Sequence, residues 1–295
     1  VGAGNDRDIS FDGAIDGISA SGHLNGNDSA TDTTLSVSTA GITANAGKSD
    51  AYAYLYNDVD AENAVAGNIA VGNVDLKVGS GAVTVTLSND VDSTAALGGV
   101  AKAGNISTGN VSMDVGKSGE AYFYQWNYAN ADNDTNKGTA SVGDLTVGNV
   151  DVKIGENGYA SYEMSHEAFS DKGDATAGNL TVGNVNVVAS GPSAGFYSWH
   201  YNRAKADTSG NAKVGNMTIG DVNLDLGDVA GYNGVSYSNW VESYKGNATI
   251  GTHSVGDVSI SVGDNVNDND DYAYFYNGAY AWAHTAGNAT IGNRT

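Results

Sequence analysis

Two acidic loops carry side chains of the kind that a calcium ion prefers. Each loop places several carboxylate and amide oxygens within a few residues, as a hard cation requires. Neither completes an EF-hand pattern, because Gly138 falls one position late and no Glu closes the site. A solvated acidic loop is therefore the favoured interpretation, and calcium binding is the alternative. The candidate ligands are Asp132, Asp134, Asn136, Asp264, Asp268 and Asp270.

The five histidines are scattered singly along the sequence. They are His23, His166, His200, His253 and His284. Nucleophilic catalysis needs a base within hydrogen-bond reach of the nucleophile, and the sequence indicates no Ser-His-Asp or Cys-His set. A β-helix enzyme that cleaves acidic polysaccharides is the remaining catalytic alternative, but no Asp or Glu cluster stands out from the repeats. We expect a non-enzymatic protein without catalytic residues and with no cofactor except, as an alternative, calcium.

Aromatic residues at every second position form a third candidate site. This alternation places the rings on one side of an extended strand. Exposed rings would stack on glycans, whereas rings facing inward or toward a neighbouring filament would stiffen a fibre. We favour the second interpretation, because so many exposed rings would promote association. The stripe comprises Tyr52, Tyr54, Tyr56, Tyr122, Tyr124, Trp126, Tyr197, Trp199, Tyr201, Tyr272, Tyr274 and Tyr276.

Three further stretches occupy the same place in the repeat without a full aromatic stripe. Residues Tyr159 to Met164 and Tyr237 to Tyr244 are looser copies, and Val83 to Leu87 contains no aromatic residue. We expect them to be strands equivalent to the aromatic ones.

Asn-x-Ser/Thr triplets recur along the repeats. In an organism that glycosylates asparagine they would be surface acceptors. The fold itself also calls for Asn at a corner and Thr on the outer side of a strand, so the triplets have a structural explanation as well. The candidate acceptors are Asn105, Asn179, Asn216, Asn247 and Asn288.

All these residues are carried by one repeating unit, whose clearest copy is Ala177 to Val187. Its second glycine recurs at an interval of about 37 residues, which is typical of solenoids and arrays. The copies are centred on Gly72, Gly109, Gly148, Gly183, Gly220, Gly256 and Gly292.

The unit predicts two short strands joined at a corner. Leu180 and Val182 share one side of an extended chain, and Val185 shares that side only if the alternation shifts at Gly183-Asn184. We expect Gly183 to adopt a positive φ, which glycine tolerates because it has no Cβ. After each corner, apolar residues alternate with Asp, Ser, Asn or Lys, as in a half-buried strand.

Each period therefore predicts one β-arch: a corner-containing strand, a turn, an aromatic strand and a polar loop. Stacked in parallel, such arches form ladders of equivalent side chains about 4.8 Å apart. We expect an all-β parallel solenoid of about seven rungs. Two shorter coils per period are the alternative, which we disfavour because the corner-containing and aromatic strands differ in composition.

The charge balance bears on the choice of partners. The 295 residues include 34 acidic and 13 basic side chains, giving a net charge of −21, and no cysteine. Nucleic acid would be repelled, and no run approaches the ~20 apolar residues that span a bilayer. We expect no nucleic-acid partner and no membrane insertion. The acidic, Asn- and Thr-rich composition suggests a secreted protein.

The two ends differ from the repeats. Residues 1–48 are expected to be an irregular cap or linking arm with a degraded repeat, and residues 49–295 the array. The last repeat lacks its second strand, so we expect head-to-tail assembly through Ala289 and Ile291 on one side. Apolar residues of the arm would add a strand to the neighbouring subunit. They are Ile9, Phe11, Ile15 and Ile18.

Over residues from about 50 to 295, the Gly-Asn repeat units and aromatic strands resemble extracellular fibre proteins of the functional-amyloid and β-solenoid type, such as curli-like subunits and bacterial repeat adhesins. This resemblance implies secretion and self-assembly into a surface fibre or biofilm matrix. We expect a subunit of an extracellular filament that binds copies of itself. A surface adhesin that binds glycans through the aromatic stripe is the alternative.

Overall fold

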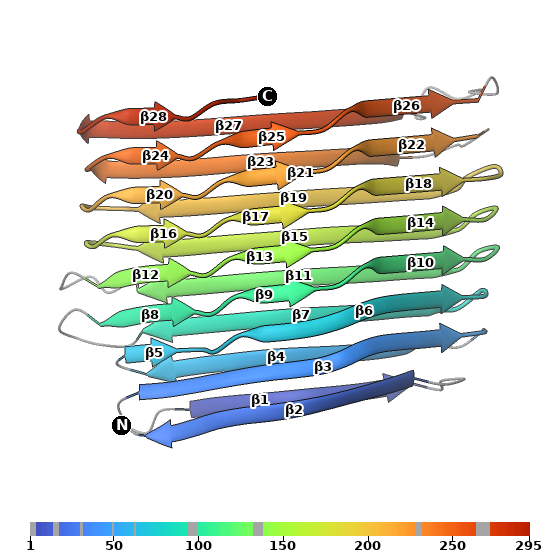
Figure 1. The fold of residues 1–295 in the computed structure, drawn as a ribbon, viewed down its shortest axis with the longest axis horizontal. Coiled ribbons are helices and arrows are strands. Elements are labelled where there is room, and N and C mark those ends of the chain that lie inside the picture. Colours follow the sequence, from blue (N-terminus) through green and yellow to red (C-terminus); the bar gives the residue numbers. More distant parts are fainter. Residues whose placement is uncertain are drawn as a thin grey trace.

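The computed structural model is a stack of β-rungs (Figure 1). It describes residues 4–13, 18–29, 32–48, 50–61, 63–93, 99–131, 138–227, 232–263 and 272–295. All elements in these ranges are strands, and the rungs follow one another from the N-terminal to the C-terminal side. The prediction of an all-β parallel solenoid with one rung per period is confirmed, with about six turns where about seven rungs were expected.

One side of the stack is an eight-stranded sheet of long strands, here called the long-strand sheet. Apart from β1, its neighbours pair in parallel and in register, so equivalent residues of successive repeats lie side by side. Its strands are β1 (Gly4–Gly13), β4 (Ala51–Ala61), β7 (Ala82–Ser93), β11 (Glu120–Ala131), β15 (Tyr159–Ser170), β19 (Gly195–Ala206), β23 (Tyr232–Lys245) and β27 (Tyr272–Ala286).

The other side, the segmented sheet, is divided into three short strands in most rungs. The first segments are β5 (Asn63–Val65), β8 (Val100–Ala103), β12 (Thr139–Val142), β16 (Ala175–Ala177), β20 (Ala212–Val214), β24 (Ala248–Ile250) and β28 (Ala289–Ile291). The second are β9 (Ile106–Thr108), β13 (Leu145–Val147), β17 (Leu180–Val182), β21 (Met217–Ile219) and β25 (His253–Val255). The third are β10 (Val111–Val115), β14 (Val150–Ile154), β18 (Val185–Ala189), β22 (Val222–Leu226) and β26 (Val258–Val262). Near the N-terminus, β3 (Asp32–Ala46) and β6 (Ile69–Val78) are continuous.

The first strands run against the rest of the stack. Strand β1 pairs antiparallel with β4, and β2 (Ile18–Ser29) pairs antiparallel with β3. This arch covers the N-terminal edge of both sheets (Figure 1). Ile9, Phe11 and Ile18 lie on these strands, whereas Ile15 lies outside the described residues.

Gly-Asn corners separate the short segments, as the shift in alternation at Gly183-Asn184 predicted. Val182 and Val185 are both buried on either side of that corner. The expected positive φ at Gly183 is wrong, because the described glycines with positive φ are Gly191, Gly210 and Gly287. Glycine is required at 183 for a steric reason instead: an added Cβ would lie 2.5 Å from Asn149 Oδ1 in the preceding rung.

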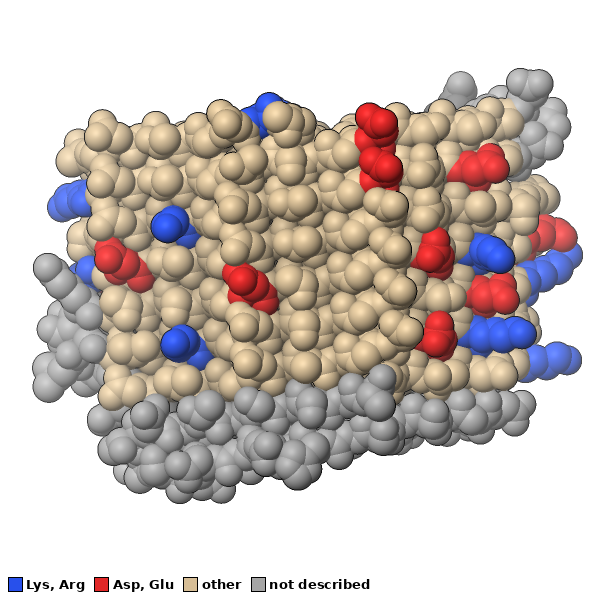
Figure 2. Space-filling model, viewed as in Figure 1, with Lys and Arg blue, Asp and Glu red and all other residues tan. Residues whose placement is uncertain are grey.

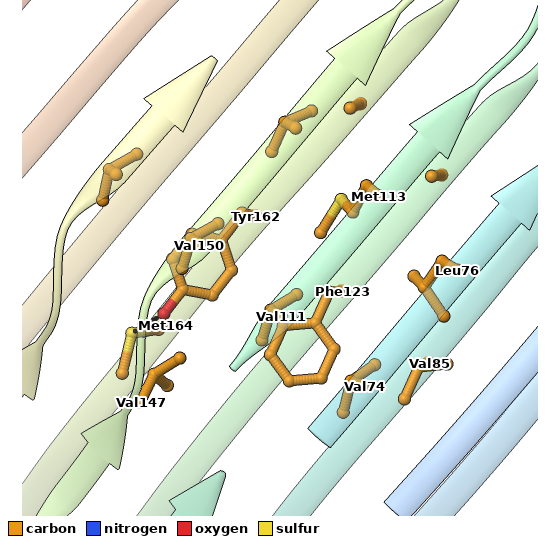
Figure 3. Packing of buried hydrophobic residues seen from close by; sticks show 14 of the residues in the cluster. Val74, Leu76, Val85, Val111, Met113, Phe123, Val147, Val150, Tyr162 and Met164 are labelled. Carbon is orange, nitrogen blue, oxygen red and sulfur yellow. Dashed lines mark hydrogen bonds between the residues drawn. The ribbon is translucent and has the colours of Figure 1, made fainter. Parts of the chain in front are cut away.

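Apolar side chains from the two sheets meet in two core clusters. The larger cluster joins the first half of the long strands to the second and third segments, and holds Val, Leu, Ile, Met and aromatic residues (Figure 3). The smaller cluster is mostly alanine and joins the second half of the long strands to the first segments. The two sheets therefore enclose two apolar clusters that run side by side along the stack.

Candidate functional site

The aromatic stripe lies on the outer face of the long-strand sheet. Inward positions of β4, β7, β11, β15, β19 and β23 are buried and those of β27 are half-buried, whereas the stripe residues between them are half-buried or exposed, with Trp126 at 44% and Tyr276 at 39%. The side chain of Tyr272 lies outside the described residues. The rings are not part of the rung core, so the stripe is available for contact with another molecule.

Stacking arranges these rings in ridges on alternate rungs. The register places Tyr54 beside Thr86, Thr86 beside Tyr124, and Tyr124 beside Glu163. It then places Glu163 beside Trp199, Trp199 beside Ser236, and Ser236 beside Tyr276. The aromatic strands β4, β11, β19 and β27 form ridges about 9.6 Å apart, twice the strand spacing. Strands β7, β15 and β23 form troughs between them, because at the positions in register with the stripe they carry mostly small residues. These are Thr84, Thr86 and Ser88 on β7, Ser161 and Ser165 on β15, and Gly234, Ser236 and Ser238 on β23. Larger outward residues, such as Phe169 and Trp240, lie outside these positions and contact rings of the ridges.

Neighbouring rings within a ridge contact one another along the strand. Tyr52 and Tyr54 have ring centroids 6.3 Å apart with planes 6° from parallel. Trp199 and Tyr201 have centroids 5.2 Å apart with planes 15° from parallel. Such contacts orient each ring, so a ridge is an ordered row rather than a set of independent side chains.

Two of the troughs are open grooves. The β7 groove has a volume of about 460 Å³, and the rings of Tyr54, Tyr56, Tyr124 and Trp126 line it. Asp58 and Asp90 also line this groove. The β23 groove has a volume of about 280 Å³ and is lined by aromatic residues and serines.

Charge on this face is concentrated in the second half of the strands. Asp58 and Asp60 of β4 lie beside Asp90 and Asp92 of β7. Desolvation by burial and, to a smaller extent, the nearby carboxylates of Asp92 and Asp58 raise the pKa of Asp90 to about 6. This end of the face is strongly negative at neutral pH.

On β19, the residues in register with Asp90 and Asp92 are the basic residues Arg203 and Lys205. Arg203 lies 4.7 Å from the ring centre of Phe169 and 5.5 Å from that of Trp240. Its Nη1 is 3.6 Å from Glu167 Oε2, and Lys205 Nζ is 3.0 Å from Asp207 Oδ1. The stacked rings hold the guanidinium in place on the sheet.

A column of buried polar residues runs between the two core clusters. Asn57 donates to Asn89 at 2.7 Å, and Asn89 donates to Asn127 at 3.2 Å. Asn127 and His166 then donate to the carbonyl oxygens of Gly104 and Gly143, at 2.9 and 2.5 Å. This column was not predicted from the sequence, although an Asn recurs at the same position of most repeats. Its bonds tie the long strands to the corners of the segmented sheet.

The asparagines of the candidate glycosylation triplets form ladders at the corners. The Oδ1 atoms of Asn105, Asn179 and Asn216 accept the backbone N–H of the residue one rung further along, at 2.7, 2.9 and 2.8 Å. Asn247 accepts from the N–H of Asn288 in the same way, at 3.0 Å. These amides have a structural role; their use as glycan acceptors stays a prediction.

Three histidines lie in the interior. Ser198 Oγ and His200 Nε2 are 2.6 Å apart, a distance suited to a nucleophile and its base, but both side chains are fully enclosed. Burial lowers the pKa of His200 to about 3, and the pKa values of His166 and His253 to about 4. His284 lies at the surface, 2.8 Å from Glu242 Oε1.

The six candidate calcium ligands lie outside the described residues. Within the described ranges, no group of three or more His, Cys, Asp or Glu side chains could hold a metal ion. The described part of the chain also holds no helix long and apolar enough to cross a bilayer.

The outer face of the segmented sheet differs from the aromatic face. Figure 2 shows it as largely uncharged, with most Asp, Glu, Lys and Arg gathered toward the side of the third segments. Its middle column consists mainly of Thr and Ser, which are Ser107, Thr146, Thr181, Thr218 and Ser254.

Comparison of the chain with protein-family models, with curated proteins and with solved structures finds no match.

Proposed function

We propose that this protein is a non-enzymatic structural subunit of a secreted filament or matrix fibre, in which solenoids add end to end. The observation that carries this proposal is the uniform rung-to-rung register of both sheets. Because successive parallel rungs pair through equivalent strands and corner ladders, one rung is a template for another.

The proposal places the contact between copies on the rung formed by β26, β27 and β28. Val258, Ile260 and Val262 are 41%, 39% and 43% exposed, although their counterparts one rung below are at most 2% exposed. Ile291 is 44% exposed and its counterpart Ile250 is 1% exposed. In the proposal, another copy supplies the rung that packs on this surface, with Ala289 and Ile291 at the contact.

In the proposal, the arch formed by β1 and β2 is the part of the chain that one copy donates to the next, which is here called arm exchange. In one subunit β1 pairs with β4, so arm exchange requires β1 to leave this edge and pair with a neighbour. A head-to-tail contact of this kind does not close on itself and therefore propagates.

Deleting residues 1–20 tests the arm. The proposal expects a folded, β-rich monomer that no longer forms fibres in electron micrographs, while the full chain does. Fibres of normal length from the truncated chain would reject arm exchange and leave direct stacking of rungs as the route of growth.

A surface adhesin is the second candidate function, and the β7 groove favours it. Its volume of about 460 Å³ falls within the range of small-ligand sites. Rings that stack on sugar faces and carboxylates that accept from hydroxyl groups would suit a glycan. Binding of soluble polysaccharides by the wild type, lost in Tyr124→Ala without loss of fibres, would assign this function to the groove.

A further inference from the structure

We propose that two copies of the chain pair face to face through their long-strand sheets, with the aromatic ridges of each copy seated in the troughs of the other. This lateral pairing goes beyond the end-to-end growth proposed above and does not depend on it.

The spacing of ridges and troughs allows two copies to interlock. Ridges recur every second rung, and between them β7, β15 and β23 carry mostly small residues at the positions in register with the stripe. A second copy has the same spacing, so a shift of one rung, about 4.8 Å, brings every ridge opposite a trough. The rungs of Figure 1 stack with little rotation, so the ridges and troughs stay in phase across several rungs.

One symmetry operation produces this arrangement. A two-fold axis parallel to the strands, placed between β11 and β15, sets β4 against β23, β7 against β19, and β11 against β15. In each pair one strand carries a ridge and the other a trough. Tyr124 of one copy then lies opposite Glu163 of the other, where its hydroxyl can donate to the carboxylate. The contact is isologous, as in most homodimers.

Charge pairing favours this position of the axis over positions one rung away. A two-fold axis parallel to the strands leaves the position along the strand unchanged, so each residue faces a residue with which it is in register across the sheet. Asp90 therefore faces Arg203 and Asp92 faces Lys205, twice per dimer. Moving the axis by one rung keeps ridges in troughs but sets Asp90 against Tyr280 or Tyr128. Opposed charges of this kind fix register and partner choice.

One opposed pair is unfavourable. Asp60 would face Glu242, whose carboxylate is already 2.8 Å from His284 Nε2 in its own chain. The two attractive pairs per half outnumber this one.

The contact is large enough for a stable dimer. Six rungs span roughly 29 Å and ten strand residues roughly 33 Å, giving a footprint of roughly 900 Å² per copy. Stable interfaces bury about 800 Å² per partner. The ridges supply Tyr and Trp, the residues in which binding energy is usually concentrated.

Analytical ultracentrifugation of charge-reversed variants tests the proposal. Asp90→Lys with Asp92→Lys, or Arg203→Glu with Lys205→Glu, should each weaken dimerisation at least about tenfold. A mixture of the two variants should dimerise again, because each restores the complement of the other at one half of the interface. The chain carrying all four substitutions should recover the affinity of the wild type.

The matched control is Asp114→Lys with Asp151→Lys on the segmented sheet, which changes charge equally and should leave the dimer intact. Circular dichroism shows whether each variant is folded. A wild type that stays monomeric at about 100 µM, or charge variants that the mixture does not rescue, would overturn the proposal. End-to-end growth is distinguishable, because it does not stop at two copies.

Discussion

The two sheets differ in how the chain passes through each rung. Most rungs cross the segmented sheet in three short strands whose Gly-Asn corners bond directly to the corners of the next rung. Each rung crosses the long-strand sheet in one uninterrupted strand, and at the positions of the stripe its outward residues change from aromatic to mostly small on alternate rungs. The corners of the segmented sheet therefore fix the shape of the rung, whereas the outward residues of the long-strand sheet can vary and form a contact surface.

Breaking a corner should have the largest effect on folding. Gly183→Val would place a Cβ 2.5 Å from Asn149 Oδ1 and 2.9 Å from Asn149 N, so two rungs must move apart. We expect a loss of about 3 kcal/mol in the free energy of unfolding, measured by urea denaturation. Ser165→Val, on the long-strand face, is the matched control and should change little. Equal stability of both variants would contradict the role assigned to the corner.

Opening the buried column should have the next largest effect. Asn89 is both donor and acceptor in the column, so Asn89→Ala leaves the amides of Asn57 and Asn127 without this partner. We expect a loss of about 2 to 3 kcal/mol in the free energy of unfolding. Ser88→Ala, one residue earlier and facing outward, is the control. A loss no larger than that of the control would mean that the column does not join the sheets.

His166 adds a pH dependence to the same column. Burial lowers its pKa from 6.5 to about 4, so between these values the unfolded chain binds a proton that the folded chain does not. Stability should therefore fall as pH drops from about 6.5 to 4, with His166 contributing about 2 kcal/mol of this loss at pH 5. His166→Asn, which matches Asn127 and Asn202 of the adjacent rungs, should reduce the slope. An unchanged pH profile of urea midpoints would exclude this assignment.

Removing a ridge should have the smallest effect on the fold. Replacing Tyr197, Trp199 and Tyr201 by Ser removes half-buried rings from the outer face and leaves both core clusters intact. We expect unchanged β-structure by circular dichroism, with less than about 1 kcal/mol lost per residue, and clearly weaker association. The control changes Thr146, Thr181 and Thr218 on the segmented face to Ala. Collapse of the fold in the ridge variant would place the rings in the core.

The sequence predicted features that depend on neighbouring residues of the chain. The shift at Gly183-Asn184 and the outward alternation of Tyr122, Tyr124 and Trp126 follow from the two-residue period of a strand. The reason for glycine at 183 was wrong, because the atom that excludes a side chain belongs to Asn149 in another rung.

Features created by the stacking of rungs were harder to predict from the sequence. Asn89 meets Asn57 only because residues 32 positions apart become neighbours. Likewise, the sequence showed Tyr159 to Met164 and Tyr237 to Tyr244 as looser copies, and Val83 to Leu87 as a copy without aromatics. The structure shows these stretches to be the troughs β15, β23 and β7, because the register sets each of them between two ridges.

Electron microscopy and fibre diffraction of the purified chain at rising concentration test the proposed function most directly. We expect filaments whose axis follows the stack, with a reflection near 4.8 Å along that axis. Dispersed single particles at every concentration, or filaments whose 4.8 Å spacing lies across the axis, would contradict end-to-end addition of rungs.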